Sequence, residues 1–341
     1  MTADLVLVTG ATGFIAKHCI AELLRAGYAV RGTVRSVARR GEVEAALRQA
    51  GIADPEIEVV EADLLRDDGW PAATRGCRYV LHVASPFPSG EPSDADQLIR
   101  PARDGALRVV RAAASNGVER IVQTSSVAAI MMCPKAHHLP RTEEDWTDVD
   151  NPDVGSYARS KTLAERAAWD AIGEMGDAAP AFCTVNPGVV LGPALDKDLS
   201  TSHVLIRLLG RGVYPALPKV AFPVVDVRDV ARQHVTAMTH PDAAGSRWLA
   251  CNGTLSLRDI GRVIVDALPD LERKVPTIEL PSAMVRLASH FDRNLKSIRA
   301  DLGRANLCDN SKTVNKLGIE FRSADEAVSS AAKSLRELGI I

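Results

Sequence analysis

The chain has 341 residues, of which 46% are hydrophobic and 25% charged, and its formal net charge is −2. This composition is typical of a globular protein large enough for one sizeable domain with an appended lobe. The near-neutral charge gives no reason to expect nucleic acid as a partner, and no apolar run approaches the roughly 18 residues that a membrane span needs.

The cysteines and the N-terminus predict a cytoplasmic protein. Six cysteines are scattered along the chain, with no paired spacing that would indicate a metal site. An apolar segment begins at Leu5, which leaves no room for a signal peptide. We therefore expect reduced thiols and no metal.

Residues 5–16 predict a buried parallel strand, a glycine turn and the start of a helix. This is the first unit of a dinucleotide-binding sheet, in which Gly10 would make the tight turn and Gly13 would let the backbone approach a pyrophosphate. The phosphates would bind the N–H groups at the N-terminus of the helix. We expect cofactor contacts from Gly10, Thr12, Gly13, Phe14 and Ile15.

The second predicted strand, residues 29–34, ends at Arg35, where NAD-binding proteins carry Asp or Glu for the ribose 2′-hydroxyl. The nearest acid here, Glu42, falls in the next helix. A guanidinium suits a phosphate, so the sequence favours NADP(H), with Arg35 on the 2′-phosphate. Arg39 and Arg40 either assist Arg35 or only begin a solvated helix.

Three further strands are predicted at residues 57–62, 79–84 and 120–126, with a long helix over 95–116. Open α/β sheets bind ligands beyond the carboxyl ends of such strands. Asp63 and Leu64 would meet the adenine, although Asp63 could equally be a helix N-cap. His82 is expected in the core. The other cofactor candidates at these strand ends are Val83, Ala84, Ser85 and Thr124.

The second half of the chain begins with an irregular stretch over 131–152, which predicts a functional loop over the site. A long helix starts at 156, and a sixth strand over 181–186 runs into a rigid turn, 187–193, in which Pro187 and Val190 could face a nicotinamide. Further helices are predicted at 257–268, 282–297 and 324–338. We expect an NADP-binding domain over 1–193, with a returning segment near 224–240, and a mainly substrate-binding lobe over 194–341.

Ser126, Tyr157 and Lys161 are the catalytic candidates. Tyr157 and Lys161 are four apart and share one helix face, 31 positions after the strand end that carries Ser126. A hydride delivered to a carbonyl carbon leaves an oxyanion, which Tyr157 could protonate as general acid. A Lys161 ammonium about 4 Å away would lower the pKa of Tyr157 from its usual value of about 10. Ser126 could donate a hydrogen bond to the same oxygen, and Lys161 would also hold the nicotinamide ribose.

These motifs together resemble the extended short-chain dehydrogenases/reductases, and more narrowly the dihydroflavonol reductase, cinnamoyl-CoA reductase and yeast aldehyde/ketone reductase branch. The matching stretches are residues 8–15, 30–36, 82–86, 124–126, 156–165, 186–193 and 226–231. The resemblance implies an α/β fold of Rossmann type, a doubly wound parallel sheet of about seven strands with a smaller C-terminal substrate lobe. It also implies NADPH as cofactor and Ser126, Tyr157 and Lys161 as catalytic residues.

One departure from that branch bears on the substrate. Plant dihydroflavonol reductases carry Asn five positions after the catalytic Ser, where this chain has Met131. An apolar, adaptable wall suits a hydrophobic carbonyl compound better than a polyphenol. The expected walls contain no cluster of Arg or Lys, and comprise Phe87, Met131, Val204, Leu208 and Phe222.

Two other functions stay open. One is a nucleotide-sugar epimerase or dehydratase, although such dehydratases usually place Asp-Glu after the catalytic hydroxyl residue, where Val127 and Ala128 stand here. The other is a non-catalytic NADP-sensing protein, which would tend to lose the Tyr and the Lys. The protein is expected as a monomer, or as a homodimer through the helices over 95–116 and 157–175.

Overall fold

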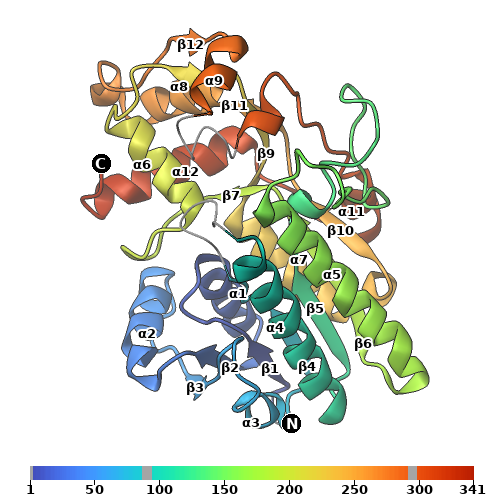
Figure 1. Cartoon of the computed structure of the whole chain (residues 1–341). Coiled ribbons are helices and arrows are strands. Elements are labelled where there is room, and N and C mark those ends of the chain that lie inside the picture. Colours follow the sequence, from blue (N-terminus) through green and yellow to red (C-terminus); the bar gives the residue numbers. More distant parts are fainter. Residues whose placement is uncertain (1–2, 87–93, 291–297) are drawn as a thin grey trace.

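The computed structural model describes residues 3–86, 94–290 and 298–341. Its centre is a sheet of seven parallel strands in the order β10-β6-β5-β4-β1-β2-β3 (Figure 1). These strands are β1 (Leu5–Val8), β2 (Ala29–Val34), β3 (Ile57–Glu61), β4 (Tyr79–His82), β5 (Arg120–Thr124), β6 (Ala181–Pro187) and β10 (Arg247–Ala250). The strand order reverses between β1 and β4, which is where a doubly wound sheet forms its ligand crevice. The predicted fold class is confirmed.

Helices cover both faces of this sheet, so its strands are buried on both sides. Successive residues of β1 point to opposite faces: Val6 and Val8 join one apolar cluster and Leu7 joins another. The first cluster includes residues of α1 (Phe14–Arg25), α2 (Arg40–Gln49) and α7 (Val227–Thr239). The second includes residues of α3 (Trp70–Thr74), α4 (Asp96–Ser115) and α5 (Ser156–Met175). These helices fix the strand ends that carry the candidate site.

The chain leaves the central sheet after β6 and later returns to it. The predicted rigid turn over 187–193 is wrong in part, because it contains β7 (Val189–Leu191), which pairs with β9 (Ala221–Asp226). Gly188 permits this crossing, since a Cβ there would lie 2.4 Å from the carbonyl oxygen of Pro223. The return runs through α7 and reaches β10, at residues 247–250.

A smaller lobe sits above the carboxyl ends of the central strands in Figure 1. Its own apolar core lies among two small sheets, β11-β9-β7 and β12-β8, and the surrounding helices. These further elements are α6 (Thr201–Gly210), β8 (Leu217–Pro218), β11 (Thr254–Ser256), α8 (Leu257–Ala267), β12 (Glu279–Leu280), α9 (Ser282–Ala288) and α12 (Ala324–Glu337). The helix α11 (Ser311–Leu317) instead packs beside β10 and α7. The helix predicted over 282–297 ends at Ala288 as α9, and residues 291–297 lie outside the described part of the chain.

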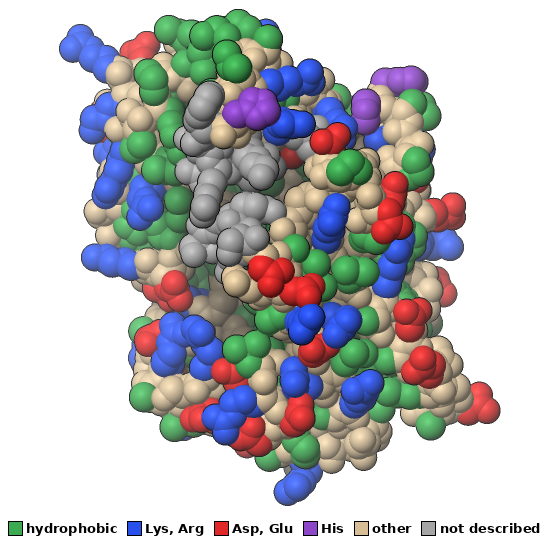
Figure 2. All heavy atoms as spheres, viewed as in Figure 1, with side chains coloured by type: hydrophobic (Ala, Val, Ile, Leu, Met, Phe, Trp, Pro, Cys, Tyr) green, Lys and Arg blue, Asp and Glu red, His purple; other side chains and the backbone are tan. Residues whose placement is uncertain are grey.

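Within the described ranges, no helix combines the length and the apolarity that crossing a bilayer would take. Figure 2 shows acidic and basic side chains interspersed over the lower part of the face in view.

Candidate active site

The glycine turn after β1 has the geometry of a phosphate cradle. Gly10 has φ +69°, and a Cβ there would lie 3.0 Å from the Cβ of Ala84. Only glycine takes this conformation and this approach without strain. Gly13 is exposed at the N-cap of α1, and no side chain of the described structure caps the helix there. The first N–H groups of α1 are thus accessible to an anion. Thr12, Phe14 and Ile15 are half-buried at the same edge.

A buried hydrogen-bond chain joins this turn to the end of β4. The Thr9 hydroxyl lies 2.9 Å from Nδ1 of His82 and accepts a 2.9 Å hydrogen bond from the N–H of Ala84. Burial lowers the pKa of His82 to about 3, so its ring is neutral, and the prediction of a core histidine is confirmed. Val83, Ala84 and Ser85 follow as half-buried residues facing the switch point.

The arginines after β2 divide into two kinds. Arg35 is exposed at the strand end, and among the described residues no carboxylate pairs with it. Arg39 pairs with Glu42 at 2.7 Å and with Asp198 at 3.5 Å, and Arg40 pairs with Glu44 at 2.7 Å. Arg39, the half-buried N-cap of α2, and Arg40, its exposed first residue, thus have carboxylate partners, and of these three arginines Arg35 is the one left available.

Asp63 forms a turn after β3 and does not begin a helix. Its Oδ1 accepts a 2.9 Å hydrogen bond from the N–H of Leu65, and its carbonyl accepts one from the Trp70 indole at the same distance. The nearest helix, α3, starts at Trp70. The alternative of Asp63 as a helix N-cap is therefore wrong, because only a turn follows Asp63 and its side chain has no helix N-terminus to cap. Leu64 is half-buried beside it.

The end of β5 carries three hydroxyls that point to different partners. Thr124 bonds through its hydroxyl to Nε2 of His234 on α7, at 2.7 Å. The Ser125 hydroxyl donates to Oε2 of Glu165 at 2.5 Å. Ser126 accepts a 3.1 Å hydrogen bond from the N–H of Ala128 and is also hydrogen-bonded to Tyr157. The structure thus brings Ser126 and Tyr157 together, as the spacing predicted.

Tyr157 and Lys161 lie on the first two turns of α5, and burial dominates both of their pKa values. Burial raises the pKa of Tyr157 to about 12, while the hydrogen bond with Ser126 lowers it. Burial lowers the pKa of Lys161 to about 8, while Glu165 raises it. The Lys161 ammonium lies 6.0 Å from the centroid of the Tyr157 ring. In the protein alone, burial therefore outweighs any lowering by Lys161, and the pKa of Tyr157 stays above its usual value.

Glu165 is a site residue that the sequence analysis missed. It is fully buried one turn beyond Lys161, and its carboxylate accepts hydrogen bonds from Ser125, Thr184 and Asn186. Arg247 of β10 pairs with it at 2.6 Å and lies over the Trp146 ring, 3.6 Å from its centroid. Asn186 in turn donates to the carbonyl of Ser126 at 3.3 Å. The one available signal was two charged residues, Glu165 and Arg247, in otherwise apolar patterns.

The predicted nicotinamide and substrate contacts lie on different elements around the cleft. Pro187 ends β6, and Val190 on β7 is buried against the central sheet. Met131 is half-buried with its sulfur 3.6 Å from that of Cys308. Val204 and Leu208 are half-buried on α6, Phe222 packs on the lobe core, and Phe87 lies outside the described residues. None of these five wall residues is basic, but next to Met131 the side chain of Arg304 contacts the sulfur of Met132 at 2.9 Å, and Arg304 lines a separate pocket with Arg286 and Arg299.

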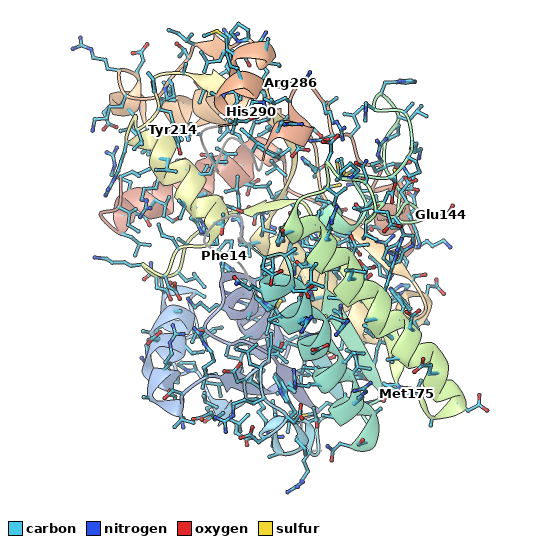
Figure 3. All side chains as sticks on the ribbon, viewed as in Figure 1. Phe14, Glu144, Met175, Tyr214, Arg286 and His290 are labelled. Atoms are coloured by element: carbon cyan, nitrogen blue, oxygen red, sulfur yellow. The ribbon has the colours of Figure 1, made fainter. Side chains whose placement is uncertain are left out.

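Several contacts tie the lobe to the glycine turn. Phe14, labelled in Figure 3 where α1 meets the lobe, packs edge-on against His203 of α6 with ring centroids 4.4 Å apart. The buried Lys17 pairs with Asp196 at 2.5 Å, and His18 lies 3.1 Å from the carbonyl oxygen of Pro193. The segment that enters the lobe is thereby fixed beside the expected cofactor.

Comparisons with known proteins agree with this fold. The model of the NAD dependent epimerase/dehydratase family matches residues 6–250. Cinnamoyl-CoA reductase 1 of Petunia hybrida is 31% identical over 348 residues, which cover 99% of this chain and 94% of that protein. Tetraketide alpha-pyrone reductase 1 of Arabidopsis thaliana is 31% identical, with 98% and 96% covered. The solved structure of yeast methylglyoxal/isovaleraldehyde reductase Gre2, complexed with NADPH, matches with a TM-score of 0.79 at 27% identity, over 99% of this chain and 100% of that one.

Proposed function

The chain belongs to the NAD dependent epimerase/dehydratase family, and within it we propose that the protein catalyses the reversible NADPH-dependent reduction of an aldehyde or ketone to an alcohol. Its relatives are reductases of the branch that the sequence resembles. The observation that carries the proposal is the hydrogen bond between Ser126 and Tyr157 at the carboxyl end of β5, beside the buried Lys161.

The residues around the switch point fit a dinucleotide. The turn at Gly10 and Gly13 leaves room for a pyrophosphate against the N-terminus of α1. Arg35, with no acid at the end of β2, supports NADP(H) over NAD(H). When bound, the cofactor supplies a hydride from its nicotinamide ring. The small residues Ala84 and Ser85 line a narrow crevice with Lys161, which places the lysine where it could hold a ribose.

The proton comes from Tyr157 in this proposal. A phenol with a pKa of about 12 stays protonated at neutral pH, so it is available as an acid in the direction of reduction. The alkoxide that forms as the carbonyl is reduced is a stronger base than this phenolate, so proton transfer to it is favourable. Ser126 would donate to the same oxygen and fix its position. Lys161, with a pKa of about 8, is mostly cationic at pH 7 and favours the phenolate that remains.

The reacting end of the substrate is proposed to be hydrophobic. Met131, Val204, Leu208 and Phe222 offer half-buried apolar surface, and burial of such surface contributes about 25 cal/mol per Å². Aryl and medium-chain alkyl carbonyl compounds would gain most from these walls. Sugars would lose hydrogen bonds to water there without replacement.

The experiment that tests this function is NADPH oxidation by the purified protein with a panel of aryl ketones, alkyl aldehydes, nucleotide sugars and small hydroxy acids. We expect measurable turnover with the aryl and alkyl carbonyls and a higher kcat/KM with NADPH than with NADH. A higher specificity constant for a nucleotide sugar or a small hydroxy acid than for every aryl ketone would overturn the proposal. So would binding of NADPH without turnover of any carbonyl compound, which would favour a sensor.

A further inference from the structure

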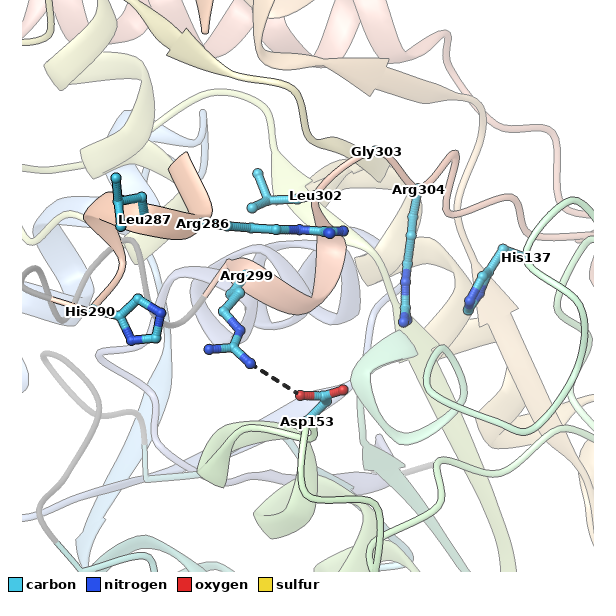
Figure 4. Close-up of a pocket in the computed structure, with 9 residues that line it drawn as sticks. All are labelled: His137, Asp153, Arg286, Leu287, His290, Arg299, Leu302, Gly303 and Arg304. Atoms are coloured by element: carbon cyan, nitrogen blue, oxygen red, sulfur yellow. Dashed lines mark ion pairs between the residues drawn. The ribbon is translucent and has the colours of Figure 1, made fainter. Parts of the chain in front are cut away.

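A second cavity lies in the lobe, outside the catalytic residues. It has a volume of about 760 Å³ and is lined by residues of α9, by His290, by residues between 299 and 304, and by the loop before α5. Figure 4 shows Arg286, Arg299 and Arg304 directed toward this space, with His137 beside Arg304. In Figure 2, basic and histidine side chains adjoin one another over the upper part of this face. We call this cavity the arginine pocket.

The arginine pocket has more positive than negative charge. Three guanidinium groups face one lining carboxylate, Asp153, which pairs with Arg299 at the long distance of 3.9 Å. In the described part of the chain no carboxylate pairs with Arg286 or Arg304. Burial raises the pKa of the Asp301 carboxyl, although this carboxyl accepts a 3.1 Å hydrogen bond from Asn306 and interacts electrostatically with Arg304, both of which lower that pKa. The positive charge also acts on His137, because Arg304 lowers the pKa of that ring.

The arginine pocket adjoins the proposed active site. Asp153 lies four residues before Tyr157, so their Cα atoms are at most about 14 Å apart. Arg304 reaches the sulfur of Met132, the neighbour of the expected apolar wall at Met131. An elongated molecule with one end at Tyr157 could therefore place its other end among the arginines.

We propose that the arginine pocket binds an anionic group, a carboxylate or a phosphate, at the far end of an elongated carbonyl substrate whose reacting end is apolar. This rests on the proposed function and refines it. Guanidinium groups are suited to either anion, because their planar N–H donors match its oxygens in pairs. The apolar walls at Met131 and α6 would hold the body of the substrate, and the arginines would fix its length and orientation.

A matched set of substrates tests the refinement. The pairs are 6-(4-acetylphenyl)hexanoate against its amide, and 6-(4-acetylphenyl)hexyl phosphate against its alcohol. We expect kcat/KM about tenfold higher for at least one anion than for its neutral partner. The advantage should shrink at high salt, because Arg286 and Arg299 are exposed to solvent. The anion with the larger advantage is the class for which the pocket is built, and equal kcat/KM for anionic and neutral partners would overturn the proposal.

Variants link the effect to the pocket. Arg286→Gln and Arg299→Gln should each reduce the ratio of kcat/KM between anion and neutral partner several-fold. Arg258→Gln, an exposed arginine of α8 outside the pocket, should leave that ratio unchanged. Melting temperatures show whether each variant is folded. Ratios that stay at the wild-type value in folded Arg286→Gln and Arg299→Gln proteins would assign any charge preference to another surface.

A binding measurement separates this proposal from the reductase function. Calorimetric titration with 6-phenylhexanoate, which has no aldehyde or ketone to reduce, should give tighter binding than 6-phenylhexanamide, and Arg286→Gln should remove the difference. This result without any ketone turnover would retain the anion site and reject the reductase. Ketone turnover with equal binding of acid and amide would retain the reductase and reject the anion site.

Discussion

Two groups of charged residues differ in how they are partnered. In the inner group, Glu165 and Arg247 are buried and bonded to each other. In the outer group, Arg35 after β2 and Arg286 on α9 are exposed, and in the described ranges neither faces a carboxylate within ion-pair distance. Arg247 thus has its carboxylate partner within the protein, whereas Arg35 and Arg286 are left available to a ligand.

The difference follows from the cost of desolvation. A buried charge without a partner is strongly destabilising, so the inner charges must be matched inside the chain. An exposed guanidinium is solvated, so leaving it without a partner costs little folding free energy, and it remains available to bind a ligand. The inner network is therefore suited to holding the geometry of Ser126 and Lys161, and the outer arginines are suited to recognition.

The largest effect is expected from Tyr157→Phe, which tests the site that the inner network holds. The change keeps the ring but removes the proton, and losing general acid catalysis costs about 10²–10⁴-fold in rate. Affinity for NADPH, measured by fluorescence titration, should survive because the phosphates would bind at the glycine turn. The control is Tyr214→Phe, at an exposed position of the lobe. Near-normal turnover by Tyr157→Phe would remove this residue from the mechanism.

Glu165→Gln should break the inner network while keeping its shape. Arg247 would lose its buried counter-charge, and breaking such a pair costs about 3 kcal/mol or more of unfolding free energy. Denaturant unfolding measures this loss. Glu174→Gln, on the exposed part of the same helix, should change stability by less than about 0.5 kcal/mol. Equal stability of the two variants would show that Arg247 is held by its hydrogen bonds to the carbonyl oxygens of Glu143 and Asp145 alone.

The same variant has a pH signature that a purely structural role would not produce. Glu165 raises the pKa of Lys161, so removing its charge should lower that pKa further below about 8. If cationic Lys161 supports turnover, kcat falls as pH rises through this pKa. The fall should therefore begin about one pH unit lower in Glu165→Gln than in the wild type. An unshifted profile would separate Glu165 from the electrostatics of Lys161.

The inner geometry shows how far the sequence could predict this protein. Gly10, Tyr157 and Lys161 are set by local spacing: a turn after a strand, and two side chains on one helix face. The pairing of Glu165 with Arg247 spans 82 positions, so no local pattern predicts it. The same holds for the arginine pocket, in which the loop before α5 meets residues 286–290 and 299–304.

Short elements explain the remaining differences in the fold. The strand β7 has three residues, and its sequence Val-Val-Leu between two prolines carries no periodicity that separates a strand from a turn. It forms because β9 offers a partner, which is a tertiary effect. Asp63 likewise has the sequence of a helix cap, but the chain makes only a turn before α3. Local sequence patterns were sufficient to predict the long periodic helices and strands, and insufficient to predict β7 and the turn at Asp63.

The smallest expected effect compares Arg35 of the outer group with Arg39. Arg35→Gln should raise the Kd for NADPH about tenfold and leave that for NADH unchanged, because a 2′-phosphate would lose a charge-assisted partner. Arg39 already has Glu42 and Asp198 as partners, so Arg39→Gln should raise the Kd by less than about threefold. An equal loss of NADPH affinity in the two variants would mean that Arg39 leaves its carboxylate partners and binds the phosphate. An exposed ion pair is worth at most about 1 kcal/mol, so a phosphate could displace it, and the ratio of the two losses measures whether it does.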